Sequence, residues 1–581
     1  MRWEANSVRA MLHRTLAALA LLLTAACSTL PPPTAAAAAP QWGPERGIVS
    51  AADPRGAEAG AAMLRQGGSA TDAAIATMLA LTVVEPQSSG IGGGGFLIHA
   101  APDGTVETLD GRESAPAAAT PARFLDAQGR PLPFSEAVIG GLSVGVPGNI
   151  ALAAELHRRH GVLPWASLFD PAIALARDGY QVTERMREFL VRAQNRAALD
   201  PVGRQLFYDS AGEAVPAGTL VRNPQLAATL ERIAQGGPEA FQRGDLAREM
   251  AEAIAAATPR DGRMTAADIA AYRALEREPV CGAYRLYRIC GMGPPSSGAT
   301  TVLAILKQLE HFDLAALGPR SPVSWHLFAE SQRLAYADRD RYLADSDFVT
   351  VPVAGLTDPA YLAARGALIA ADARMATVEP GTPAGIASLP PPGEGPVESG
   401  TTHFAVVDRQ GNVISYTSTI EGSFGSGLMV GGFYLNNELT DFSFVPEVEG
   451  RAVANRVEGG KRPRSSMAPT IVFDAAGEPL LAIGAAGGAT IPVQVAKALI
   501  GVLDWGLDAQ AAIALPGLFA PGDSVAIEQG SWLAELRPQL EALGHQVSER
   551  ALPFKANAVE RGPDGWSGAA DPRSDGVAVA E

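Results

Sequence analysis

The spacing of apolar and polar positions divides the chain into recognisable elements. Residues 53–68 begin with an acid and a proline and end in paired glycines, which predicts a capped helix. Residues 69–84 form an alanine-rich run that predicts a second, buried helix. Residues 96–100 and 105–110 flank a Pro-Asp-Gly turn and predict a β-hairpin. From 147 to about 376 helical periodicity dominates, so helices and strands are both expected.

The character of the chain changes at residues 380–399. This stretch is rich in proline and glycine and cannot hold a regular element. A long loop inside a folded chain is usually functional or cleavable. Residues 401–408 and 413–419 follow as a hairpin around a Gly-Asn turn. A further pair of strands is expected at 470–473 and 480–483, and a helix from about residue 492.

Composition supports a large folded protein. The chain has 581 residues, of which 47% are hydrophobic and 19% charged, so it can bury a sizeable core and is not generally disordered. Its net charge of −16 argues against a nucleic-acid partner, because phosphate binding needs a basic face.

The first residues predict export. Residues 1–26 have a basic start and a short apolar run, and small residues precede Cys27, so they resemble a lipoprotein signal peptide with Cys27 as the lipidation site. Thr24 stands where leucine is more usual, and simple signal cleavage nearby is the alternative. Residues 27–45, rich in proline and alanine, are expected to be a tether. A membrane contact is therefore expected only through a lipid anchor.

Two further cysteines, Cys281 and Cys290, lie close together in the sequence. Export to an oxidising compartment favours a disulfide between them that closes a hairpin. No Cys/His spacing indicates a zinc site, and we expect no metal or cofactor. His157 and His160 lie in a polar, helix-like stretch and are expected to be solvated.

Thr401 follows the proline-rich loop and opens a strand. A hydroxyl is a weak nucleophile until a base removes its proton, and no Ser-His-Asp set is evident. If the bond between Gly400 and Thr401 breaks, the freed α-amine of Thr401 lies beside its own hydroxyl and can act as the base. The position also fits a β-branched residue that merely begins a strand. Thr401 alone does not separate these interpretations.

Several blocks resemble the gamma-glutamyltransferases and occur in the same order. Gly400 to Phe404 (Gly-Thr-Thr-His-Phe) matches the processing site of that family. The resemblance extends over about residues 47 to 575, through blocks at 89–96, 110–116, 294–298, 424–427, 435–443, 461–470 and 570–573. The resemblance rests on the whole set of blocks in this order and not on any single block.

The resemblance implies roles around the nucleophile. Thr401 would be both the site of self-cleavage and the acyl-accepting nucleophile. Thr419 would hydrogen-bond near its hydroxyl. Gly487 and Gly488 precede a predicted helix, and their N–H groups would stabilise the oxyanion.

It also implies an amino-acid head-group site. Arg112 would bind the α-carboxylate of the donor, because its planar fork matches a carboxylate, and Ser465 and Ser466 would add hydrogen bonds. Glu438 and Asp441 would hold the α-ammonium group. Taken singly, these residues also fit a surface ion pair, a turn and a solvated loop.

Two departures from the family concern the same pocket. Glu421, which we also expect to contact the substrate, stands where many members have Asn. The segment 443–460 is shorter than in members with a lid, so the chain looks like the lidless type. Alanines at 485 and 486 replace the more usual Ser-Pro, with no evident consequence.

The family implies an α+β fold, the four-layer αββα sandwich of the N-terminal-nucleophile hydrolases. Residues 46–400 would form the large subunit and 401–581 the small one, a heterodimer that shares one domain. The expected activity is that of a gamma-glutamyltransferase and glutathione hydrolase in the periplasm or outer membrane. A γ-glutamyl donor would acylate the threonine, and water or an amino acid or peptide acceptor would release the product.

Three alternatives remain at this point. Ser143 lies in a G-x-S-x-G sequence, which would suit a serine esterase if a helix began directly after it. An acylase for larger amides, such as a cephalosporin or glutaryl acylase, would use the same fold. A non-catalytic lipoprotein that binds small peptides would leave the chain uncut.

Overall fold

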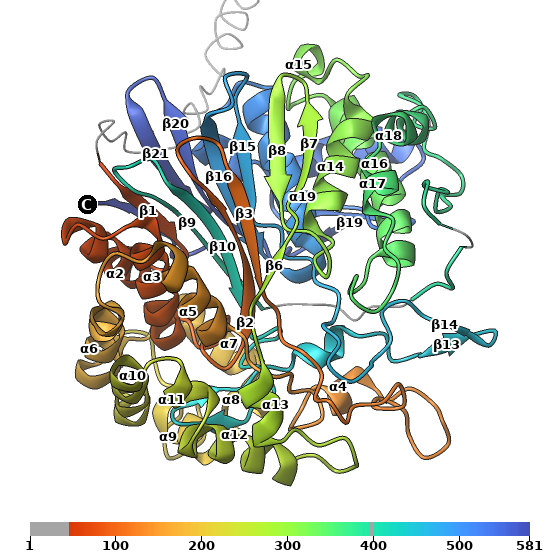
Figure 1. The fold of residues 1–581 in the computed structure, drawn as a ribbon. Helices are drawn as coiled ribbons and strands as arrows, with labels where there is room; N and C mark the ends of the chain where they lie inside the picture. Colours follow the sequence, from red (N-terminus) through yellow and green to blue (C-terminus); the bar gives the residue numbers. More distant parts are fainter. Residues whose placement is uncertain (1–45, 387–388, 394–399) are drawn as a thin grey trace, which may run out of the picture. The chain divides into compact units, whose positions relative to one another are not determined.

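Two antiparallel sheets pack face to face at the centre of the fold (Figure 1). The computed structural model describes residues 46–386, 389–393 and 400–581. The expected signal peptide, Cys27 and the tether therefore lie outside the described residues. Within the described ranges, every helix is too short or too polar to cross a bilayer.

The first sheet combines strands from both sides of residue 400. All seven strands are joined by antiparallel pairing. Their order is β22 (Val577–Ala580), β1 (Ile48–Ala51), β9 (Thr402–Val407), β10 (Val413–Thr419), β2 (Gly94–Ala100), β3 (Val106–Gly111) and β6 (Leu275–Arg277).

The second sheet is also antiparallel and also mixes the two halves of the chain. Its order is β21 (Gly565–Ala570), β20 (Lys555–Gly562), β16 (Pro479–Ala486), β15 (Thr470–Phe473), β8 (Tyr287–Gly291) and β7 (Val280–Tyr284). Strands β9 and β10 of the first sheet pack on β16 of the second.

Helices cover the outer face of each sheet, which completes the expected αββα sandwich. On the first sheet lie α2 (Pro54–Arg65), α3 (Ala70–Val84) and α5 (Asn149–His160). On the second lie α14 (Gly298–Leu309), α19 (Ile491–Leu503) and α20 (Ala509–Ala514), and α16 (Pro322–Tyr342) packs on α14.

Local sequence explains the helix boundaries. The Asp53 side chain accepts a hydrogen bond from the Arg55 N–H and caps α2. Ser69 and Asp72 form a reciprocal capping box at the start of α3. Every residue of α3 is buried, as its apolar composition predicts, because the helix lies between the first sheet and other helices.

The stretch expected to be mainly helical also contains strands. β6, β7 and β8 interrupt it, and β7 and β8 form a hairpin in which Cys281 and Cys290 face each other and are joined by a disulfide. The other helices are α4 (Phe134–Ala137), α6 (Asp170–Asp178), α7 (Glu184–Arg192), α8 (Gln194–Ala197), α9 (Pro201–Phe207), α10 (Pro224–Gly236), α11 (Glu239–Gln242), α12 (Asp245–Ala256), α13 (Ala266–Ala271), α15 (Leu314–Leu317), α17 (Val353–Leu356), α18 (Pro359–Gly366) and α21 (Leu533–Ala542), with 3-10 turns η1 (Trp165–Phe169), η2 (Glu438–Asp441) and η3 (Gly488–Thr490).

The remaining strands are short or form a small sheet apart from the two central ones. They are β4 (Tyr180–Gln181), β5 (Leu220–Val221), β11 (Met429–Val430), β12 (Phe433–Tyr434), β13 (Glu447–Val448), β14 (Arg451–Ala452), β17 (Leu518–Phe519), β18 (Ser524–Glu528) and β19 (Gln546–Arg550).

Candidate active site

Thr401 lies at the head of β9, an inner strand of the first sheet. It is buried, with 6% of its surface exposed. In the uncut chain its hydroxyl contacts the carbonyl oxygen of Gly400. A side chain at Gly400 would meet the Glu421 carbonyl oxygen at 2.5 Å, so only glycine fits at this position. Thr401, the candidate nucleophile, and the Gly400 carbonyl group are therefore held together in a closely packed site.

Thr419 ends β10, the antiparallel neighbour of β9. The register pairs Ser418 with Thr402, which brings Thr419 level with Thr401. The Thr419 hydroxyl donates to the Gly400 carbonyl oxygen at 2.8 Å and lies 3.4 Å from the Thr401 hydroxyl. It also accepts from the Glu421 N–H at 2.8 Å, which fixes its position. The expected hydrogen bond near the Thr401 hydroxyl is thus present.

Gly487 and Gly488 follow β16 and lead into η3 and α19. Gly487 lines the same cavity as Thr401. Both have positive φ angles, of 124° and 59°, and a Cβ on Gly487 would lie 2.2 Å from the Pro553 carbonyl oxygen. Within the described residues neither N–H has an acceptor. Two free donors beside a nucleophile can stabilise an oxyanion.

The cavity beside Thr401 has a volume of about 550 Å³ and a basic wall. Lys555 in this wall is paired with Glu85, at 3.1 Å. Arg185 donates to the Arg573 carbonyl oxygen, but its Nε has no partner within the described chain. Burial lowers the pKa of Arg196, whereas the negative charge of the nearby Glu421 acts to raise it. The cationic members of the wall are Arg185, Arg192, Arg196, Lys555 and Arg573.

Arg112 is only 1% exposed and lies between two acids of η2. It forms ion pairs with Glu438 and Asp441. Its guanidinium also donates to the carbonyl oxygens of Pro463, at 3.2 Å, and Arg464, at 2.9 Å. The cation and the anions expected to bind opposite ends of an amino acid are therefore in contact with one another. The surface and solvated-loop interpretations of these residues are wrong, because all three are buried.

Ser465 and Ser466 directly follow the Arg464 carbonyl that Arg112 binds. The Ser465 carbonyl accepts from the Ser297 N–H at 2.7 Å, and its hydroxyl accepts from the Met467 N–H at 3.1 Å. Ser466 accepts a hydrogen bond from Arg339. Ser465 is thus held by the 294–298 block and Ser466 by α16, directly after the backbone carbonyls that Arg112 binds.

Glu421 connects the threonines to the head-group residues. It has a positive φ of 69°, and its carboxylate accepts from the Asn437 side chain. Asn437 also accepts from the Gly422 N–H at 2.9 Å and immediately precedes Glu438. A continuous set of contacts therefore joins the Thr401 hydroxyl to the surroundings of Arg112.

Glu113 is a further member of this site to which we assigned no role from the sequence, although it follows Arg112. Both of its carboxylate oxygens are buried, and the carboxyl group lies within hydrogen-bonding reach of the Glu438 carboxyl group. Burial raises the pKa of Glu113 to about 7, against the opposing effect of Arg112. Burial likewise raises the pKa of Glu438 well above its usual range. The positive charge of Arg112 opposes this rise, whereas the negative charge of Glu113 adds to it. The cluster holds more carboxylates than cations.

Ser143 does not form an esterase elbow. Its hydroxyl is buried and donates to the carbonyl oxygens of Val138, at 2.9 Å, and Gly140, at 3.1 Å. The following helix, α5, begins only at Asn149. The strand–turn–helix that the motif requires is therefore absent here.

A buried threonine at the head of an inner strand, in an αββα sandwich, defines the class of N-terminal-nucleophile hydrolases. Residues 56–581 match the sequence profile of the Gamma-glutamyltranspeptidase family, and the chain belongs to that family.

Relatives in the family carry two kinds of name. The glutathione hydrolase proenzyme of Bacillus subtilis (strain 168) is 36% identical over 546 residues, covering 92% of this chain and 91% of that protein. The acylase ACY 1 proenzyme of Pseudomonas sp. (strain V22) is 35% identical, covering 92% and 93%. The crystal structure of a cephalosporin acylase from Bacillus halodurans has a TM-score of 0.82 at 28% identity, covering 95% of this chain and 98% of that one.

Proposed function

We propose that this protein cleaves itself before Thr401 and is then a gamma-glutamyltransferase and glutathione hydrolase. The observation that carries the proposal is the contact of the Thr401 hydroxyl with the Gly400 carbonyl, with the Thr419 hydroxyl bonded to the same oxygen. Family membership over nearly the whole chain supports the activity.

This geometry supports self-cleavage by the following steps. The Thr401 oxygen adds to the Gly400 carbonyl carbon, its proton passes to the Thr401 nitrogen, and the C–N bond breaks to leave an ester and a free amine. Water hydrolyses the ester, which leaves a carboxyl group on Gly400 and restores the hydroxyl. Thr419 stabilises the charge that develops on the Gly400 oxygen.

The freed amine then supplies the missing base. It takes the proton of the Thr401 hydroxyl as the oxygen attacks the γ-carbonyl carbon of the donor. The N–H groups of Gly487 and Gly488 bind the oxyanion, and the leaving amine departs with a proton. Water or the amine of an amino acid or peptide then attacks the acyl-enzyme and releases Thr401.

The buried charges support a donor with an amino-acid head group. Arg112 would exchange part of its contact with the acids for the donor α-carboxylate, next to Ser465 and Ser466. Glu438 and Asp441 would then hold the α-ammonium group, and Glu421 would contribute from the Thr419 side. Beyond the scissile bond, the basic cavity wall would attract the carboxylate of a leaving or accepting peptide.

The decisive experiment combines mass spectrometry with a γ-glutamyl anilide assay, with and without a dipeptide acceptor. The wild-type chain should yield a fragment that begins Thr-Thr-His-Phe and should release the aniline. Thr401→Ala should remain uncut and inactive, whereas Ser143→Ala should be cut and active. An intact chain with full activity, or loss of activity on Ser143→Ala alone, would contradict the proposal.

An acylase for larger amides is the second candidate. The similarity to the acylase ACY 1 proenzyme and to the cephalosporin acylase structure favours it. The buried Arg112 and Asp441 favour an α-amino acid head group instead. Hydrolysis of a glutaryl amide, which lacks the α-amino group, as fast as its γ-glutamyl counterpart would decide for the acylase.

We further propose that residues 46–400 and 401–581 remain together as a heterodimer of large and small subunits. Each central sheet takes strands from both, so separation would expose the inner faces of both sheets. Size-exclusion chromatography of the cleaved protein should give one peak that contains both fragments.

The sequence of residues 1–27 supports export as a lipoprotein to the periplasm or outer membrane. Labelling with a radioactive fatty acid, compared with Cys27→Ser, tests the anchor. An exported wild-type protein without label would leave simple signal cleavage as the explanation.

A further inference from the structure

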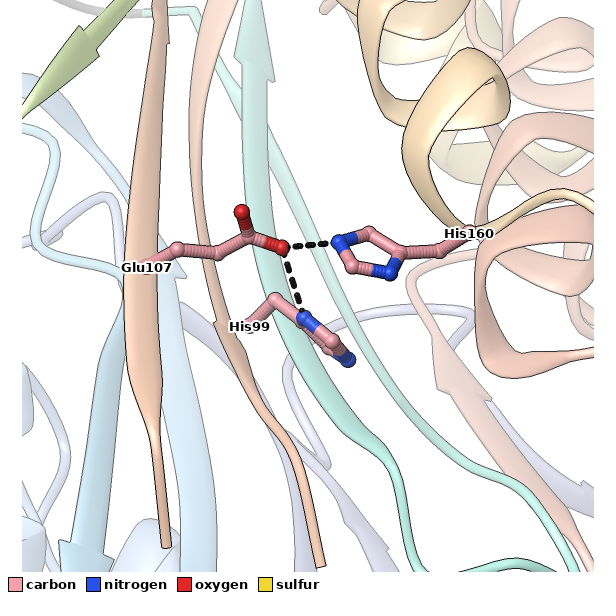
Figure 2. Close-up of side chains that lie close together, drawn as sticks. All are labelled: His99, Glu107 and His160. Carbon is pink, nitrogen blue, oxygen red and sulfur yellow. Dashed lines mark hydrogen bonds and ion pairs between the residues drawn. The ribbon is translucent and has the colours of Figure 1, made fainter.

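Three potential metal ligands meet away from Thr401, where β2, β3 and α5 come together (Figure 2). His99 on β2 is paired across the ladder with Glu107 on β3, and its Nδ1 lies 2.8 Å from Glu107 Oε1. His160, the last residue of α5, brings its Nε2 to the same oxygen. The three ligand atoms lie within 4.8 Å of one another.

The cluster is partly enclosed. The side chains of His99, Glu107 and His160 are 5%, 17% and 34% exposed. His160, which was expected to be solvated, is only partly so, because α5 ends against the first sheet and the residue is half-buried there. His157 on the same helix is also half-buried and contacts the Leu163 carbonyl oxygen at 2.9 Å, outside the cluster.

Two imidazole nitrogens and one carboxylate oxygen are a usual donor set for Zn²⁺, whose bonds to N and O are about 2.0–2.2 Å long. Donor atoms on a tetrahedral ion then lie roughly 3.3 Å apart, which small side-chain rotations can reach from the present spacing. We propose that His99, Glu107 and His160 bind one Zn²⁺ ion, with the fourth position open to water on the exposed side of His160.

The neighbouring charges fit this assignment. Glu107 presents Oε1 to the two imidazoles, while Arg159 Nη1 binds its other oxygen, Oε2, at 3.0 Å. Arg159 is in turn held by Glu155, at 2.8 Å, and Glu276, at 2.9 Å. Such outer partners orient a ligating carboxylate. The two further acids also offset the positive charge of Arg159 near the cation.

The position indicates a structural role. On β2, His99 lies opposite Ile414, whereas Gly94 lies opposite Thr419. Five residues of strand separate these positions, roughly 16 Å at about 3.3 Å per residue. An ion at His99 would thus fasten the end of α5 to the β2–β3 hairpin, and it would take no part in the chemistry at Thr401.

The test uses the full, cleaved protein after treatment with a chelator and dialysis. Isothermal titration with Zn²⁺ should give one equivalent of saturable binding. The melting temperature should rise by about 2–3 °C at a hundredfold excess over Kd. His99→Ala, Glu107→Gln and His160→Ala should each weaken binding by more than about tenfold. His157→Ala, on the same helix, is the matched control and should bind like the wild type.

Activity on a γ-glutamyl anilide should stay within about twofold of the wild type in all four variants at a temperature where they are folded. Absence of one saturable equivalent, or equal binding by His160→Ala and His157→Ala, overturns the site. A melting temperature that responds to pH but not to Zn²⁺ also overturns it and leaves a hydrogen-bonded His–Glu–His cluster. If the protein binds Zn²⁺ but loses activity in proportion to the metal that the chelator removes, the structural role of the site is overturned.

Discussion

The hydroxyl oxygens of Thr401 and Thr419 lie 3.4 Å apart, at adjacent ends of β9 and β10. The Thr419 hydroxyl also donates to the Gly400 carbonyl oxygen, at 2.8 Å. The Thr419 side chain therefore contacts both the Thr401 hydroxyl oxygen, which would attack, and the Gly400 carbonyl group that would be attacked. The register of a single strand pair produces this arrangement.

We expect Thr419→Ala to slow self-cleavage by about 10²-fold, which is typical when one donor to an oxyanion is removed. Thr419→Ser should restore most of the rate because it keeps the hydroxyl. Thr417→Ala is the matched control, since Thr417 lies on the same strand but bonds to His403. Intact-mass spectrometry of the freshly made chain over time measures the rate. If Thr419→Ala cleaves itself at the wild-type rate, Thr419 takes no part in self-cleavage.

Arg112→Lys should lower kcat/KM for γ-glutamyl donors by at least about tenfold, because lysine cannot bind a carboxylate with two parallel hydrogen bonds. Self-cleavage should stay normal. The matched control is Arg333→Lys, an equally buried arginine paired with Glu330 that does not line the Thr401 cavity. Steady-state kinetics and melting curves of both variants separate binding from folding. Unchanged kcat/KM in Arg112→Lys would place Arg112 outside the donor site.

Stability should fall as the pH drops from about 6.5 towards 3, in part because of His403. Burial lowers the pKa of His403 to about 3, from 6.5. The unfolded chain takes up a proton near pH 6.5 and the folded chain only near pH 3, so the contribution is complete above 6.5 and is lost below it. Each such histidine adds about 1.4 kcal/mol per pH unit to the slope within that window.

His403→Asn tests this contribution of His403 to the pH dependence of stability, because asparagine does not titrate. Its free energy of unfolding should depend on pH less steeply than that of the wild type, whatever its stability at neutral pH. His545 remains in the variant as a second source of slope, since burial and the nearby His326 and Arg333 lower its pKa to about 3 as well. Denaturant titrations at several pH values provide the slopes. If the free energy of unfolding depends on pH equally steeply in both proteins, the pKa of His403 is not lowered in the folded state.

The sequence predicted elements that depend on local signals. α3 begins where Ser69 and Asp72 form a capping box, and β9 and β10 flank the expected turn. The hairpin of β7 and β8 was expected only from its two cysteines, within a stretch dominated by helical periodicity. Its pairing with β15 could not be predicted, because that sheet is assembled only by the whole fold.

In the candidate site, too, some features could be predicted from the sequence and others arise only from the fold. Arg112, Glu438 and Asp441 were expected together because motifs resembled a family, but their mutual ion pairs follow from burial in one space. The basic wall was missed, because Arg185 and Arg192 lie on an ordinary polar helix, α7, and meet Lys555 only in the fold. Likewise, His99 and Glu107 are eight residues apart across a hairpin, and only tertiary packing brings His160 to them.

We expect no accessible thiol from Cys281 or Cys290 in exported protein, because they form a disulfide across β7 and β8. Closing a loop of this length should contribute about 2–3 kcal/mol, which the double serine variant would lose. Thiol titration before and after reduction should give two new thiols if Cys27 is blocked by lipid. A further thiol, reactive before reduction, would indicate a free Cys27. Two thiols that react before reduction in Cys27→Ser would show the disulfide to be absent.

We expect the donor site to be open to solvent and to bulky leaving groups. Within the segment 443–460, β13 and β14 form a small hairpin, and residues 447–452 of this hairpin are mostly exposed. The one aromatic residue of the segment, Phe444, stacks on Phe124 with ring centres 4.4 Å apart and does not line the cavity beside Thr401. Closing lids exclude water and select among donors.

Without such a lid, only the glutamyl head should be held tightly, and bulky groups beyond the scissile amide should be tolerated. Water should compete well for the acyl-enzyme because solvent reaches Thr401 through the adjoining cavity. We therefore expect similar kcat/KM for glutathione and larger γ-glutamyl amides, with substantial hydrolysis even in the presence of a dipeptide acceptor. A donor series of increasing leaving-group size, with products separated by chromatography, measures both effects. A steep loss of kcat/KM with size, or transfer product that dominates at low acceptor concentration, would mean that the site is covered during turnover.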